Sequence, residues 1–393
     1  MADTYTVKNK KQGFFGKMGN SFASIPLGIV IVIFGCMMLW NNEKKNVINI
    51  KDVKEMRENI KTISSEEVNS DYEGKLIATY GKLNYGDSYL VDSTFGISVK
   101  TPILKRTVEM YEWIETSETK DEETTYSYSK EWSEKVVDSS NFKKSSDHTN
   151  PTYMPYDSEK YLVDSLKVGA YDLASVFKGK LSAEKDLLNL EPGVALPEGY
   201  TVNGKYITNS KDVENPEVGD IRISFTYGEY DDVTVLGKQT GSKIGEYTTK
   251  KNSTIVRLEK GEHDGNYLIN SIESGNKFSK WMWRILGAIL VCMGVSMILS
   301  PLTTLIGYIP FLGKIVNGAI GVVSSTVGIA ISLVVIAIAW LVYRPIIGIA
   351  LIVVSVGLII LAKKYVSKKE PEKKEESKPE VKEEKEEENK EEN

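Results

Sequence analysis

Two stretches of the chain are too apolar to lie on the surface of a soluble protein. The first runs from Ile25 to Trp40, and the second from Trp281 to Ala362, where the only charged residues in 82 positions are Arg284, Lys314 and Arg344. A helix needs roughly 20 apolar residues to cross a hydrocarbon core of about 30 Å. The sequence therefore predicts a membrane protein.

The apolar residues divide into four expected spans. They cover residues 25–40, 281–300, 318–343 and 346–362, with a connector at 301–317. Trp281 and Trp283 are typical of a membrane interface, and Pro301 ends the second span. The predicted fold class is an α-helical multi-pass membrane protein with four transmembrane helices. A large β-rich α+β domain, residues 41–280, is inserted between helices 1 and 2.

Lysines next to the spans indicate the orientation. Lys8, Lys10, Lys11 and Lys17 precede the first span, and Lys363, Lys364, Lys368 and Lys369 follow the fourth. Because basic residues are retained in the cytosol, we expect cytosolic termini, residues 1–24 and 363–393, with the domain on the opposite side. Lys44 and Lys45 follow the first span and reduce the asymmetry.

Residues 25–40 also have the length of a signal peptide or lipoprotein leader. No small-x-small cleavage site follows Trp40, which disfavours a cleaved signal. Ile33–Cys36 resembles a lipoprotein box only in part, because Phe34 is bulky and the residues after Cys36 are apolar. A structural cysteine inside the span is the favoured interpretation.

Charge and cysteine content restrict what the domain can be. Between Glu43 and Lys280 there are 32 Lys plus Arg and 41 Asp plus Glu, a net charge of -9 that disfavours nucleic acid as a partner. Cys36 and Cys292 both lie in spans, so the domain must fold without a disulfide. The tail, with 10 Lys and 12 Glu from Lys363 onward, is predicted to be disordered.

Residues Val108 to Trp132 (VEMYEWIETSETKDEETTYSYSKEW) have the pattern of a long β-hairpin. Tyr126, Tyr128 and Trp132 alternate with polar residues, whereas the first arm is apolar on both faces. We expect the aromatic side chains to face a core and the acids to lie in the turn, Thr116–Glu123, and on the solvent side. The alternative is a partner- or cation-binding surface formed by Glu115, Glu118, Asp121, Glu122 and Glu123, although their spacing matches no calcium loop.

Other patterns predict a mixed fold dominated by β-structure, with a small barrel. Strands are expected at 75–81, 89–91, 200–208, 220–227, 233–239 and 253–259, and helices at 53–63 and 171–190.

The sequence predicts no catalytic, cofactor-binding or metal-binding residue. His148 and His263 are far apart in the chain, fit no zinc spacing and are interpreted as surface histidines. Gly307–Ile315 fails as a phosphate loop, because five residues separate its glycines and Ile315 replaces the hydroxyl. Arg344 is expected at the membrane interface, and Ser324, Ser325, Thr326 and Ser332 are interpreted as helix-packing groups. Asn252–Thr254 is a glycosylation sequon.

Several long motifs resemble the LUMA family of four-pass proteins of the endoplasmic reticulum and inner nuclear membrane. They are KRTVEMYEWIET (105–116), YSYSKEW (126–132), NF at 141–142, HTNPTYM (148–154), NPEVGDIRISFTY (215–227) and WLVYRP (340–345). The resemblance extends from Ile25 to about Ala362. It implies a non-enzymatic role in nuclear envelope organisation, with self-association and contacts to other inner nuclear membrane proteins and the lamina. The family defines no catalytic residues that could be carried over, and a prokaryotic source would place the chain in the cytoplasmic membrane.

The leading hypothesis is therefore a membrane scaffold that needs no cofactor, whose partners are the lipid bilayer, itself and other membrane proteins. The domain would then lie in the lumen or perinuclear space. An envelope enzyme or lipid-handling factor with a pocket in the domain is the second hypothesis, and a transporter is the third.

Overall fold

A computed structural model describes residues 3–8, 14–87, 89–120, 123–307, 312–346 and 349. The chain divides into two compact units, residues 1–336 and 337–393. Among the described residues, three helical stretches are long and apolar enough to cross a membrane: Met18–Asn59, Gly265–Ile298 and Gly321–Tyr343. They contain most of the first three expected spans. The fourth, 346–362, lies outside the described residues except for residues 346 and 349, so the four-helix count stays a prediction.

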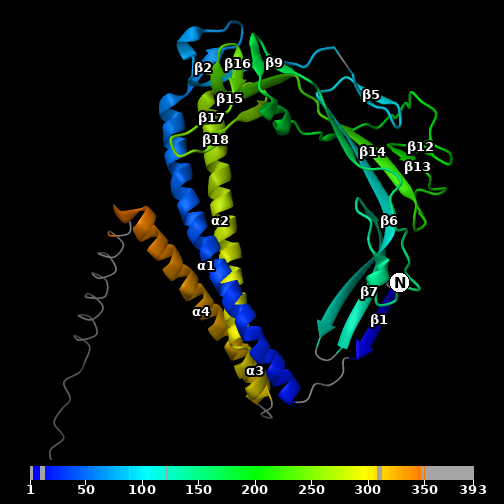
Figure 1. Cartoon of the computed structure of the whole chain (residues 1–393), viewed down its shortest axis with the longest axis vertical. Helices are drawn as coiled ribbons and strands as arrows, with labels where there is room; N and C mark the ends of the chain where they lie inside the picture. The colour runs from blue at the N-terminus through cyan, green and yellow to red at the C-terminus, as the bar shows by residue number, and fades with distance from the viewer. Residues whose placement is uncertain are drawn as a thin grey trace, which may run out of the picture. The chain divides into compact units, whose positions relative to one another are not determined.

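Helices α1 (Phe14–Asn59) and α2 (Gly265–Ile298) form an antiparallel pair (Figure 1). Both continue well beyond their apolar stretches, so residues 41–59 and 265–280 of the expected domain are helical. Asp264 begins α2 as its N-cap, since the carboxylate accepts the N–H of Tyr267 at 2.6 Å. Helix α3 (Ser300–Gly307) and helix α4 (Leu312–Tyr343) follow, with Pro301 in the first turn of α3, where proline is tolerated.

Five strands of the domain close into a small barrel, as the sequence predicts. They are β3 (Leu76–Asn84), β9 (Leu166–Val168), β10 (Tyr171–Leu173), β16 (Lys243–Gly245) and β15 (Asp232–Thr240), and β15 pairs back with β3. Strands β2 (Lys61–Ser64) and β19 (Arg257–Lys260) extend it. The 3-10 helix η3 (Ser175–Lys180) places the fully buried Phe177 in the core, together with Tyr171, Ile77 and Val235.

The outer face of the barrel packs on the helix pair. Leu76, Ala78 and Leu236 point away from the barrel core and are fully buried against α1 and α2. The helices contribute Val53, Met56, Leu268, Ile269 and Ile272 to this contact. The run Leu76–Ala78 is therefore buried on both faces of β3, which explains why it is continuously apolar.

The second sheet has eight strands and is built around the expected hairpin. Strands β6 (Ile103–Lys120) and β7 (Glu123–Ser133) pair as far as Lys120 and Glu123, so they extend further than the sequence indicated. The order is β1-β7-β6-β14-β13-β12, with β8 on β6 and β11 on β14. The remaining bounds are β1 (Asp3–Lys8), β8 (Glu159–Leu162), β11 (Lys185–Asp186), β12 (Thr201–Asn203), β13 (Tyr206–Thr208) and β14 (Ile221–Tyr227).

Short elements complete the domain. Two ribbons, β4 (Leu90–Asp92) with β5 (Ile97–Val99) and β17 (Tyr247–Thr248) with β18 (Thr254–Ile255), stand beside the large sheets, as do the 3-10 helices η1 (Ser70–Tyr72) and η2 (Ser139–Asn141). The helix expected at 171–190 is wrong, because Tyr171 and Leu173 alternate into the barrel core and pair through β9 and β16. The helix expected at 53–63 ends at Asn59, where β2 begins within two residues.

Strand β1 lies at the edge of the eight-stranded sheet. It pairs antiparallel with β7 from Asp3 opposite Tyr128 to Lys8 opposite Glu123. A strand that pairs with β7 must lie on the same side of a membrane as β7. The charge pattern instead predicts that the N-terminus lies across the membrane from β7. The β1–β7 pairing is therefore incompatible with a single crossing of the membrane by α1.

Candidate functional site

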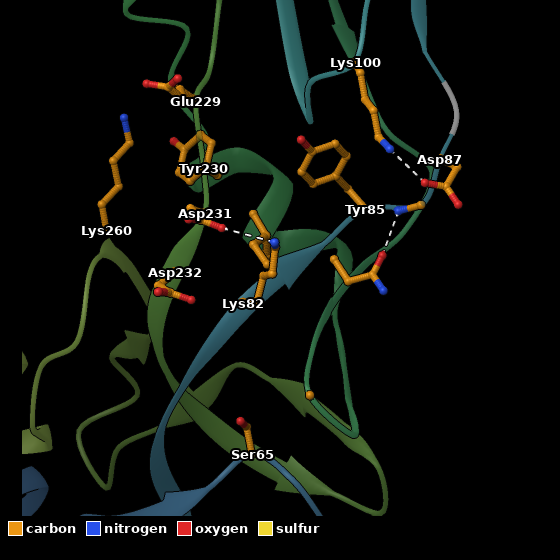
Figure 2. A pocket seen from close by; sticks show the side chains of 14 residues that line it. Ser65, Lys82, Tyr85, Asp87, Lys100, Glu229, Tyr230, Asp231, Asp232 and Lys260 are labelled. Atoms are coloured by element: carbon orange, nitrogen blue, oxygen red, sulfur yellow. Dashed lines mark hydrogen bonds and ion pairs between the residues drawn. The ribbon is translucent and has the colours of Figure 1, made fainter.

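A cleft at the rim of the barrel has a volume of about 1090 Å³. Figure 2 shows the side chains that line it. Lys82 near the end of β3 lines one wall, together with Tyr85 and Asp87 from the connection after β3, and Lys100 lies beside them. The segment Glu229–Asp232 lines the other wall, together with Lys260 at the end of β19. No histidine or cysteine is among the lining residues.

The charged groups of the cleft are paired with one another or with neighbours. Lys100 lies 2.7 Å from Asp87 and Lys82 lies 3.5 Å from Asp231, as Figure 2 shows. Outside the cleft, Glu184 pairs with Lys260 at 3.2 Å. The hydrogen bond from Lys100 lowers the pKa of Asp87, which is the direction of a stabilised carboxylate. An acid catalyst needs the opposite direction, so Asp87 is not prepared for that role.

The domain also contains one buried cation. Arg106, which is 4 % exposed, pairs through Nη1 with the fully buried Asp92 and through Nη2 with Glu159 at 3.1 Å. Its Nε donates to the carbonyl of Asp157 at 2.9 Å. Tyr161 donates to Glu159 at 2.7 Å, and burial raises the pKa of its hydroxyl. Breaking a buried pair costs about 3–5 kcal/mol, so Arg106 fixes β6, β8 and the β4–β5 ribbon together.

One acid of the hairpin contradicts the prediction that its acids face solvent. Glu112 is fully buried, because its side chain lies on the same face of β6 as Val108 and Met110. Its carboxylate accepts the N–H of Val137 at 3.2 Å. Burial raises the pKa of this carboxyl, and the Val137 hydrogen bond lowers it by less. The period-two pattern of the strand could have indicated this burial, because Glu112 follows Val108 and Met110 on the same apolar face.

The described acids of the alternative acidic surface, Glu115, Glu118 and Glu123, do not form one cluster. Glu115 accepts the Tyr128 hydroxyl at 2.7 Å and the N–H of Lys143 at 2.6 Å, so its carboxylate is used inside the fold. Glu123 lies 3.8 Å from Lys8, Glu118 is exposed, and Asp121 and Glu122 lie outside the described residues. No group of three or more potential metal ligands occurs among the described residues.

His148 is not a surface residue, which corrects the sequence interpretation. It is 1 % exposed, stacks on Tyr128 at 3.7 Å and meets the edge of Trp113 at 4.5 Å. Its Nε2 lies 2.9 Å from Asp3, and its Nδ1 lies 3.0 Å from the carbonyl of Lys144. The aromatic pattern of the hairpin gave the signal that this face is a core. His263 is half-buried and stacks on Tyr267 at 3.9 Å.

The helices hold the remaining groups that the sequence singled out. Cys36 and Cys292 are half-buried and free. Ser324 is 1 % exposed and lies 2.9 Å from Ser296, as a packing group should. The Arg344 guanidinium lies over the Trp340 ring. Residues 308–311 of the Gly307–Ile315 stretch lie outside the described residues, and Asn252 is exposed at the turn between β17 and β18.

Glycines bring α1 and α2 into close contact within the apolar stretches. A Cβ added at Gly28 would lie 2.7 Å from the Gly294 carbonyl oxygen, and one at Gly294 would lie 2.6 Å from the Gly28 oxygen. Gly35 and Gly287 form a similar pair one heptad away. Such close backbone approach is a typical means of helix association in membranes.

A buried ion pair lies where the apolar stretches end. Glu43 is fully buried and lies 2.6 Å from the Nε of Arg284, which also contacts the Trp281 ring. Two lysines of α1, Lys44 and Lys45, follow at once and are exposed. This junction, from Asn42 to Lys45 on α1, marks the passage from apolar to polar surroundings.

Comparison with known proteins identifies the family. The family model described as transmembrane protein 43 matches residues 110–345, more than half of the chain. The chain belongs to the transmembrane protein 43 family. This is the LUMA family that the motifs resemble, and membership with the apolar helices establishes a membrane-embedded protein.

Relatives in the transmembrane protein 43 family cover nearly the whole chain at low identity. Transmembrane protein 43 of Rattus norvegicus is 27% identical over 385 residues, covering 92% of this chain and 94% of the relative. The Homo sapiens protein is 26% identical over 392 residues, covering 93% and 96%. The Drosophila melanogaster homolog is 29% identical over 350 residues, covering 83% and 90%. No solved structure matches the chain.

Proposed function

We propose that this member of the transmembrane protein 43 family is a non-enzymatic membrane scaffold. The observation that carries the proposal is the continuity of α1 and α2, which run without a break from their apolar stretches into the contact with the barrel. A domain held by two continuous helices is presented at a fixed height above the bilayer. That arrangement suits a protein that organises neighbours by contact.

The proposed location is the endoplasmic reticulum and inner nuclear membrane, or the cytoplasmic membrane in a prokaryotic source. Both termini would lie in the cytosol or nucleoplasm and the domain on the other side. The lysines before the first span and after the fourth support this sidedness.

This sidedness requires β1 to leave β7 when α1 crosses the bilayer. The side chains of β1 are almost all exposed, so little apolar area holds the strand in place. The ion pair from Lys8 to Glu123 is also exposed and contributes little, whereas Asp3 would give up its contact with the buried His148.

The proposed partners are a second copy of the chain and other proteins of the same membrane, with lamina proteins in a source that has a lamina. Two differently tagged full-length copies should co-purify after solubilisation in mild detergent, and proximity labelling should mark envelope proteins. An unrelated protein with the same number of spans is the control. Recovery of neither a second copy nor any envelope protein above that control would contradict the scaffold.

The rim cleft gives an enzyme little support, since two of its carboxylates, Asp87 and Asp231, pair with lysines. The scaffold is therefore favoured over a pocket enzyme.

A further inference from the structure

A groove of about 350 Å³ follows one face of α1 at the level where the apolar stretch ends. Its residues recur at helical spacing on α1, and Trp283 of α2 closes its side. The lining residues are Phe34, Met37, Met38, Asn41, Asn42, Lys45 and Trp283.

The groove changes in polarity along its length. It begins with Phe34 and Met37, which are more than half exposed although they are large and apolar. Two asparagines follow, and it ends with the exposed Lys45. The 11 steps from Phe34 to Lys45 span roughly 16 Å at a rise of about 1.5 Å per residue. A phospholipid has matching groups in the same order along its length: an apolar acyl chain, polar ester carbonyls and a charged phosphate.

Lys45 places its ammonium group at the polar end of the groove. Among the residues that the structure describes, no carboxylate lies within ion-pair distance of its ammonium group. Glu43 is turned into the helix pair, where it meets Arg284. An anionic group would therefore find a cation, amide donors and an interfacial tryptophan close together.

We propose that this groove binds one anionic phospholipid of the leaflet on the domain side. The acyl chain lies along Phe34 and Met37, and the phosphate lies at Lys45. The apolar segment 346–362 of the same chain is a poorer occupant, because Arg344 flanks it on the domain side of the membrane and would repel Lys45. The site rests on membrane insertion and does not depend on the scaffold role.

The test uses the full-length chain in lipid nanodiscs that contain a phosphatidylserine with a photoreactive acyl chain. The matched pair of variants is Lys45→Gln and Lys44→Gln. Both remove one exposed lysine at the same depth, but only Lys45 lines the groove. Peptide mass mapping locates the labelled residues, and a photoreactive phosphatidylcholine reports on lipids that lack net charge.

The expected result is phosphatidylserine label on residues 34–38, reduced about fivefold by Lys45→Gln, the factor for ~1 kcal/mol per lysine near a charged lipid surface. Lys44→Gln should leave the label within twofold. Equal losses in both variants would overturn the proposal, since they indicate a general surface effect. Label distributed evenly around α1, equal labelling by phosphatidylcholine, or a cross-link from 346–362 to the groove would also overturn it.

Discussion

The two halves of the α1–α2 pair are held together by different contacts. In the apolar half, residues 25–40 of α1 and 281–298 of α2, glycines let the backbones touch at Gly28–Gly294 and Gly35–Gly287. In the barrel half, residues 52–59 and 265–273, large side chains such as Met56 and Leu268 fill the space against the barrel. Glycines set the close spacing in the apolar half, with Leu39 and Val291 packed beside them, and large side chains alone fill the contact in the barrel half.

The difference follows from the solvent around each half. Lipid tails are as apolar as leucine, so burying a leucine between helices in a bilayer gains little, and close packing must supply the attraction. Around the barrel half the solvent is water, and each buried Leu or Met contributes about 1.5–3 kcal/mol. The Glu43–Arg284 pair lies where the two regimes meet. The predictions below test whether each half depends on its own contact.

The largest expected effect is at the junction. Glu43→Ala removes the carboxylate that meets Arg284 in a fully buried position and should destabilise the helix pair by about 3–5 kcal/mol. Thermal unfolding of the full chain in detergent measures it. The charge exchange Glu43→Arg with Arg284→Glu should recover part of the loss. If the charge-exchange variant is no more stable than Glu43→Ala, the contact between the two charges does not stabilise the helix pair.

The barrel half should respond to the loss of large side chains. Leu236→Ala leaves a cavity between the barrel and both helices and should cost about 2–5 kcal/mol, measured by denaturant unfolding. Leu188→Ala, at a position 64% exposed, is the control and should change stability by less than about 0.5 kcal/mol. Equal effects would show that the barrel is not packed on the helices.

The apolar half should respond to the gain of a small side chain. Gly294→Ala puts a methyl group 2.6 Å from the Gly28 oxygen and should cost about 1–3 kcal/mol by forcing the helices apart. Gly275→Ala in the same helix meets nothing within 4 Å and should be neutral or stabilising by roughly 0.5–1 kcal/mol. Disulfide cross-linking between cysteines introduced in the two helices reports their separation. Unchanged cross-linking in Gly294→Ala would contradict the close contact.

The smallest effect is expected for the exposed ion pair of the barrel half. Arg57 lies 2.8 Å from Glu273, but both side chains are about one-third exposed. Arg57→Ala should cost only about 0.2–1 kcal/mol, and added salt should remove most of the difference. A loss of stability as large as that of Glu43→Ala would show that solvent exposure does not determine how much each ion pair contributes.

Much of this architecture is readable from local pattern. Hydropathy locates the apolar stretches, and period-two alternation locates β6 and β7, because each signal lies within one element. The lengths of α1 and α2 are not readable in this way. Lys44 and Lys45 indicate the end of a span, yet the helix continues for 14 residues to Asn59 because Val53 and Met56 pack on the barrel.

The groups that sequence reasoning misplaced depend on partners far along the chain. Glu112 and His148 are polar residues whose burial is set by Val137, Tyr128 and Trp113. Arg106 meets Asp92 across 14 residues and Glu159 across 53. A single sequence shows none of these pairings, so its polar residues are assigned to the surface by default.

The most direct test of the account is the sidedness of β1 and the domain. Two single-cysteine chains, with Cys36 and Cys292 replaced by alanine, carry Thr6→Cys in β1 or Asn203→Cys at the exposed end of β12. A membrane-impermeant maleimide is added to sealed microsomes before and after permeabilisation. The account predicts that the cysteine at position 6 reacts at once and that the cysteine at position 203 reacts only after permeabilisation. Equal protection of both positions, or equal reaction of both before permeabilisation, would place β1 and the domain on one side and contradict the crossing of α1.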